Sequence, residues 1–144
     1  MKRILRMFIL LVFVCFLSGC NLEQSYVNKT EFFLDEDAYI DDIAIKMTKA
    51  SINENNMLEV VFSITNNRDN TITMVADNYF KLYDINKVQI YNQYENDINI
   101  IKKDQTINYT LIYDINDKEI YEILFYSGIV ENNIKFTITS NELG

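Results

Sequence analysis

The chain has 144 residues, of which 13 are Lys or Arg, 21 are Asp or Glu and none is His, so its formal net charge at pH 7 is −8. An acidic chain without basic clusters lacks the electrostatic footprint of a nucleic-acid partner. A chain without His has no Ser-His-Asp triad and no histidine metal site, and neither Gly-rich phosphate-binding pattern occurs among its three Gly.

The first residues have the pattern of a secretory signal. Lys2, Arg3 and Arg6 precede an uncharged apolar run over residues 7–17. This run is too short to cross a bilayer as a helix, which needs about 20 residues. A signal of this kind can be cleaved at a generic site, can stay uncleaved as an anchor, or can be the signal of a lipoprotein.

The exit from the apolar run is Leu17-Ser18-Gly19-Cys20, which resembles the lipobox of bacterial lipoproteins. The resemblance implies that a diacylglycerol is attached to the sulfur of Cys20. It also implies that a peptidase, recognising Leu17, Ser18 and Gly19, cuts just before Cys20. We expect the mature protein to be lipid-anchored (palmitate or a similar acyl chain) on the extracytoplasmic face of the cell membrane, because two acyl chains hold a protein stably.

The chain then divides into a signal peptide (1–19), a lipidated Cys with a flexible tether (20–38) and a folded domain (39–144). Cys15 is discarded and Cys20 carries lipid, so the mature chain forms no disulfide. Removal of residues 1–19 takes away three basic residues and no acidic one, which leaves 10 basic and 21 acidic residues and a charge of −11. Such a domain is repelled by anionic lipid headgroups and anionic wall polymers.

The tether contains an apolar patch at residues 32–34, which we expect to dock on the domain. Acidic residues follow it, and four of them are weak candidates for a calcium site because hard cations prefer carboxylate oxygens: Asp35, Asp37, Asp41 and Asp42. No EF-hand pattern accompanies them, and charge runs are usually solvated. We therefore expect no metal and no cofactor.

From about residue 40 apolar and polar residues alternate with a period of two, which is typical of half-buried strands. Runs rich in Asn and Asp separate the strands and replace Gly and Pro as turn formers. The pattern predicts an all-β, antiparallel β-sandwich of about 7–8 strands, with a small barrel as the alternative. The predicted strands lie near residues 43–47, 58–65, 71–75, 80–83, 88–90, 107–113, 123–125 and 134–139.

Three of these segments, 58–67, 80–84 and 107–114, followed by 121–125, resemble the immunoglobulin-like domain of exported Gram-positive lipoproteins. In that family a "V-x-V-x-I-x-N" strand precedes an "F-x-L-x-D" strand, and a Pro-Gly turn leads into an "L-x-F-x-V" strand. This chain has Lys103-Asp104 where the family has Pro-Gly, and Asn86-Lys87 where a Gly is usual. The resemblance implies architecture and location, and it transfers no catalytic residue.

Tyr83, Tyr91 and Tyr94 lie near one another around a predicted hairpin and form a candidate interaction surface, because Tyr offers rigid area with a polar tip. The alternative is that they cap the edges of the core. We expect a non-catalytic binding module whose partner is an unknown protein or cell-wall component. The alternatives are a structural or accessory subunit of an envelope complex without a small ligand, or a carboxylate-dependent hydrolase.

Overall fold

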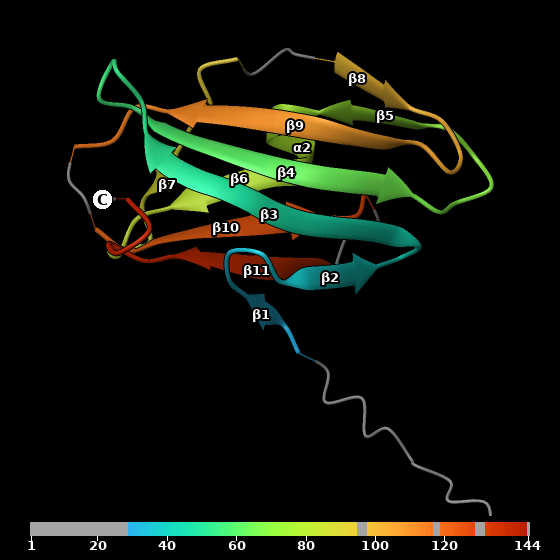
Figure 1. The fold of residues 1–144 in the computed structure, drawn as a ribbon, viewed down its shortest axis with the longest axis horizontal. Coiled ribbons are helices and arrows are strands. Elements are labelled where there is room, and N and C mark those ends of the chain that lie inside the picture. The colour runs from blue at the N-terminus through green and yellow to red at the C-terminus, as the bar shows by residue number, and fades with distance from the viewer. Residues whose placement is uncertain (1–28, 95–97, 117–118, 129–131, 144) are drawn as a thin grey trace, which may run out of the picture.

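The computed structural model describes residues 29–94, 98–116, 119–128 and 132–143, which form strands and turns almost throughout (Figure 1). The lipobox residues Leu17, Ser18 and Gly19, together with Cys20, lie outside the described residues. Within the described part of the chain, no helix is both long and apolar enough to span a membrane.

The strands build two main sheets and a short ribbon. In chain order the elements are β1 (Glu31–Phe32), β2 (Asp37–Ile40), β3 (Ile43–Ile52), β4 (Leu58–Asn66), β5 (Ile72–Val75), α2 (Ala76–Tyr79), β6 (Phe80–Tyr83), β7 (Gln89–Ile90), β8 (Ile98–Ile101), β9 (Thr106–Tyr113), β10 (Tyr121–Tyr126) and β11 (Asn133–Ile138). The sheets have the orders β1-β11-β10-β6-β7 and β2-β3-β4-β9, and the ribbon pairs β5 with β8. Among the described strands, only β1 with β11 is a parallel pair.

The core lies between the two main sheets. On β4, Leu58, Val60, Phe62 and Ile64 have no exposed surface, while the residues between them are half-buried on the outer face. The ring of Phe62 lies 5.0 Å from Phe80 and 5.1 Å from Phe136, which both belong to the opposite sheet. Each such buried side chain contributes about 1.5–3 kcal/mol. The structure confirms the predicted antiparallel β-sandwich.

Residues 31–38 differ from the expected flexible tether, because the structure places residues 31–32 and 37–38 in strands, with a turn between them. β1 pairs with β11, and β2 pairs with β3 along its whole length. The apolar patch docks in part: Phe32 is buried, its ring lies 5.8 Å from that of Phe136, and Leu34 packs against the core, whereas Phe33 is exposed. These two short strands were not predicted from the period-two pattern, because neither shows a full alternation of apolar and polar residues.

Asn and Asp form the tight turns, as predicted. Among the described residues, positive φ is found at Gly128 and at six residues other than Gly, namely Asp35, Asp41, Asp42, Asn56, Lys87 and Asp104. Asp104 stands where the resembling family has Gly, and its φ of 60° is in the left-handed region that Gly adopts without strain. The left-handed turn at this position is therefore formed by Asp.

Asn66 joins four segments at the end of β4. Its side chain is fully buried, and its Nδ2 donates to the carbonyl oxygens of Asn70 (2.8 Å) and Ile101 (3.0 Å). Its Oδ1 accepts from the Arg68 amide at 2.9 Å, and its carbonyl oxygen accepts from the Asp104 amide at 2.7 Å. Asn66 thereby fixes the end of β8 against the sandwich.

Candidate interaction surface

The segment from residue 84 to residue 101 begins after β6, contributes β7 to the same main sheet and ends with β8 of the ribbon. It begins with a turn in which Asp84 Oδ1 accepts from the Val88 amide at 2.7 Å. After β7, Asn92 is buried, and its Oδ1 accepts from the Ile112 amide at 2.9 Å on the edge of β9. The Gln93 amide donates to the Ile112 carbonyl at 2.8 Å. The segment is thus pinned to β9 before it reaches β8.

This segment carries an unusual share of exposed apolar side chains, which we term the apolar segment. In the described part of the chain nine large hydrophobic residues are exposed. Six of them belong to the apolar segment: Ile85, Val88, Tyr91, Tyr94, Ile98 and Ile100. These residues are concentrated in one stretch of the sequence, which is more informative than scattered single residues of this kind, since those are normal.

β8 departs from the pattern of the other strands. Its exposed residues are Ile98 (64% exposed) and Ile100 (60%), whereas Asn99 is half-buried and Ile101 is buried. The exposed residues of β9, by contrast, are Thr and Asn. Opposite β8, Val75 pairs with Ile98 and Thr73 pairs with Ile100, so the outer face of the ribbon is largely apolar.

The candidate tyrosines are not equivalent. Tyr91 and Tyr94 are 61% and 53% exposed, while Tyr83 is half-buried on β6 beside Glu122 of β10. No ring contact among the described residues joins these three side chains. The sequence prediction did not include Ile98 and Ile100. The signal that could have indicated them is the alternation of Ile and Asn over residues 98–100.

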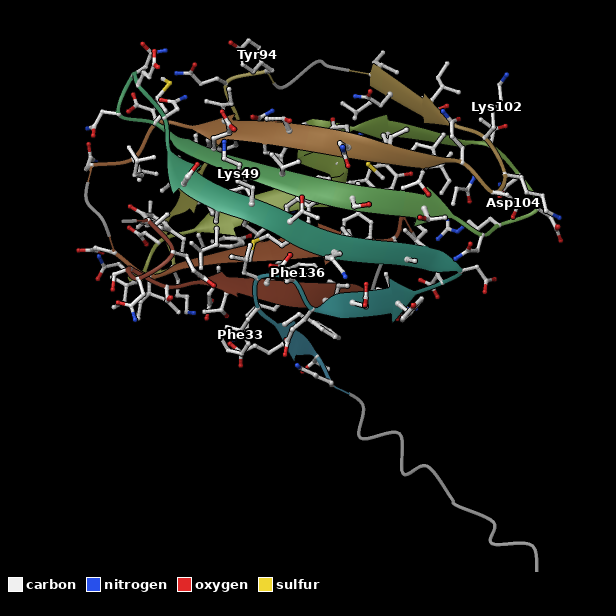
Figure 2. All side chains as sticks on the ribbon, viewed as in Figure 1. Phe33, Lys49, Tyr94, Lys102, Asp104 and Phe136 are labelled. Carbon is white, nitrogen blue, oxygen red and sulfur yellow. The ribbon has the colours of Figure 1, made fainter. Side chains whose placement is uncertain are left out.

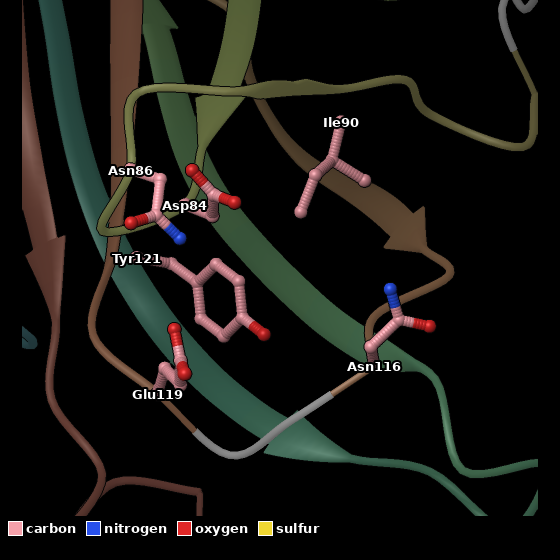
Figure 3. A pocket seen from close by; sticks show the side chains of 6 residues that line it. All are labelled: Asp84, Asn86, Ile90, Asn116, Glu119 and Tyr121. Atoms are coloured by element: carbon pink, nitrogen blue, oxygen red, sulfur yellow. The ribbon is translucent and has the colours of Figure 1, made fainter.

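A small hollow of about 240 Å³ lies beside the start of the apolar segment (Figure 3). Its lining residues are Asp84, Asn86, Ile90, Asn116, Glu119 and Tyr121. Figure 3 shows the Tyr121 ring between the carboxylates of Asp84 and Glu119. The hollow offers polar groups and little apolar surface, whereas sites for small molecules are mostly apolar. The Asp84 carboxylate already serves as the acceptor of its own turn.

The four carboxylates considered for calcium have separate surroundings. Asp37 forms an ion pair with Lys46 at 3.0 Å, and Asp41 accepts hydrogen bonds from the Ser127 hydroxyl and, at 3.2 Å, from the Asn132 side chain. Asp35 and Asp42 occupy turn positions with positive φ. Within the ranges that the structure describes, no group of three or more acidic, His or Cys residues is placed to hold a metal ion.

Asp41 belongs instead to a polar cross-link between three loops. Arg68 Nε donates to the Asp41 carbonyl at 2.7 Å, and its Nη2 donates to the Ser127 carbonyl at 2.9 Å. The hydrogen bond from the Ser127 hydroxyl, which outweighs desolvation, holds the pKa of the Asp41 carboxyl below its usual value. Three turns at one end of the sandwich are tied together by this cross-link.

A second charged group lies on the outer face of the five-stranded sheet. Lys135 forms ion pairs with Glu31 at 3.0 Å and with Glu122 at 3.3 Å, and Glu122 also accepts from Lys87. The Thr137 hydroxyl lowers the pKa of Glu31, and the Lys87 ammonium lowers the pKa of Glu122. The ion pairs of Lys135 connect β11 with its two neighbouring strands, β1 and β10, and so help to hold this sheet together.

Comparison with known proteins yields similar folds. No family model and no curated protein matches the sequence. The proposed lipoprotein ycdA of Bacillus subtilis superposes with a TM-score of 0.58 at 14% identity, over 73% of this chain and 38% of the ycdA chain. A β-sandwich protein of Clostridium difficile superposes with a TM-score of 0.55 at 13% identity, over 77% of this chain and 95% of that protein's chain. The secreted protein MPT63 of Mycobacterium tuberculosis superposes with a TM-score of 0.55 at 10% identity, over 77% of this chain and 97% of the MPT63 chain.

This chain therefore spans less than half of the ycdA chain and nearly all of the other two. At such identities the likeness shows the fold alone. It agrees with the β-sandwich built above and with the resemblance drawn from the sequence.

Proposed function

We propose that this protein is a lipid-anchored, extracytoplasmic binding module of immunoglobulin-like type, which engages a macromolecular partner without catalysis. The observation that carries the proposal is the apolar segment, where six exposed apolar side chains lie within residues 85–100. Burial of exposed apolar area is the main favourable term in protein association. An acidic chain, moreover, selects against anionic polymers, which favours a protein partner over an anionic wall polymer.

The proposed location rests on the signal pattern and on Cys20. The presence of a proposed lipoprotein and a secreted protein among the proteins of similar fold supports it. Because β1 begins at Glu31, at most ten residues separate Cys20 from the folded domain. Ten residues span at most about 35 Å when fully extended, so the domain works close to the membrane.

The chemistry of the side chains supports a proposed role without catalysis. The chain has no His, and the two carboxylates beside the hollow are separated by the Tyr121 ring (Figure 3). An accessory subunit of an envelope complex remains the second candidate, and the apolar segment fits it equally well, since it too requires a protein contact.

The test is crosslinking in intact cells, with a photoreactive residue in place of Tyr91 and, as the control, in place of Thr110 on the outer face of β9. We expect a discrete crosslinked product from position 91 and none from position 110. The Cys20→Ser variant should lose membrane attachment and the product together. Retention of that variant at the membrane refutes the anchor, and equal products from both positions refute the surface.

A further inference from the structure

We propose that the partner at the ribbon is a second copy of this chain, which pairs its β8 antiparallel to β8 of the first. This inference deepens the proposed function and rests on it, since it names the occupant of the apolar segment. The result is a continuous four-stranded sheet in the order β5-β8-β8-β5 across a two-fold axis.

The first argument is the unprotected edge of β8. Within the part of the chain that the structure describes, β8 pairs with β5 alone, so its second edge has no strand beside it. Natural edge strands are usually protected by a charge, a Pro or a bulge. The sequence of β8, Ile98-Asn-Ile-Ile101, has none of these. The edge of β9 is partly covered, because Asn92 and Gln93 bond to Ile112.

The second argument is the match of side chains under two-fold symmetry. Directly opposed residues of an antiparallel pair point to the same face. A register with Asn99 facing Asn99 of the second copy therefore sets Ile98 against Ile100, twice. Four isoleucines then shield one another on the outer face, next to Val75 of each copy.

The third argument is charge. Lys102 follows β8 directly, and the ammonium of the next residue, Lys103, is already paired with Asp69 at 2.6 Å. Antiparallel pairing places the Lys102 residues of the two copies at opposite ends of the strand pair. A parallel pairing would instead set like charges together. Figure 2 shows Tyr94 and Lys102 on either side of β8 along one margin of the molecule.

The opposing effect is the net charge of each mature chain. Charges farther apart than about 8 Å are largely screened at physiological ionic strength, so the net charge opposes the contact only where the two copies come close. Four-residue strands bury little area, and the contact is weak between free molecules. The lipid anchor confines both copies to one plane, which raises their effective concentration.

The experiment uses the full chain in its membrane. With Cys20 lipidated, the Asn99→Cys variant carries a single free thiol, and opposed residues in an antiparallel pair have the Cα separation that a disulfide needs. Mild oxidation should give a disulfide-linked dimer at least tenfold more abundant than with Thr110→Cys, an exposed position on β9. Adding Ile98→Lys and Ile100→Lys should remove that excess, because the like charges meet at the axis.

Equal dimer yields at positions 99 and 110 would overturn the inference, as would a dimer that persists with both lysines. A photocrosslink from position 91 to a different protein, without the dimer, would also overturn it while supporting the proposed binding function. Absence of both products would refute the two proposals together. Because Ile98 and Ile100 are exposed, the lysine variants should fold, which circular dichroism of the same preparations verifies.

Discussion

Replacing Asn66 by Ala should destabilise the domain far more than the same change one residue later. The Asn66 side chain is fully buried and makes three hydrogen bonds, to the Asn70 and Ile101 carbonyls and from the Arg68 amide. Each buried bond contributes about 0.5–1.5 kcal/mol net, so its removal should lower the free energy of unfolding by about 2–4 kcal/mol.

The matched control is Asn67→Ala. Asn67 is exposed and uses its backbone amide, which donates to the Asp42 carbonyl at 2.9 Å and survives the substitution. The Asn67→Ala substitution should lower the free energy of unfolding by no more than about 0.5 kcal/mol. Urea denaturation followed by circular dichroism measures both variants. Equal, small losses would refute the view that Asn66 organises this end of the sandwich. A faster hydrogen exchange of the β8 amides in Asn66→Ala would show that β8 is the strand released.

Three further results are expected. Asp104→Gly should raise the free energy of unfolding by about 0.5 kcal/mol, and Asp104→Ala should lower it by about 1 kcal/mol, because φ is 60° there; equal effects in urea denaturation would exclude the left-handed turn. The hydroxyl of Tyr113 is buried without a hydrogen-bond partner among the described residues, so Tyr113→Phe should be neutral or stabilise by about 1 kcal/mol, and a clear loss would reveal a partner. The pKa values of Glu31, Asp41 and Glu122 are lowered in the folded state; their contribution is therefore present above about pH 5 and lost as the pH falls toward 3, and a flat Tm over this range would contradict these interactions.

The strands that sequence periodicity identifies are those buried on one face. β4 and β9 alternate over their full lengths, and both were predicted to within a residue or two. β1 and β2 lie in a stretch without clear alternation, and their pairing comes from the tertiary structure, which supplies the partners β11 and β3. A single helical turn such as α2 leaves no periodic signal, because it spans only four residues.

The candidate surface was partly predictable. Tyr91 and Tyr94 are exposed as an interaction site requires, whereas Tyr83 is half-buried because its strand continues the sheet beside Glu122. Whether a Tyr caps the core or faces solvent depends on the register of its strand, which composition does not reveal. The acidic residues near Asp41 could not be resolved either, since their partners, Ser127 and Asn132, lie more than eighty residues away in the sequence.

β8 is where local and global patterns conflict. Its sequence, with isoleucines at alternate positions, favours burial of Ile98 and Ile100, yet both are exposed while Asn99 is half-buried. Ile101 is buried in the core and its carbonyl oxygen accepts from Asn66, so the end of the strand is held with Ile98 and Ile100 on the outer face. A strand held with its apolar residues outward costs stability in the isolated molecule. Covering the isoleucines with another surface would recover that cost, which is why we propose β8 as the binding strand and not the polar outer faces of the two main sheets.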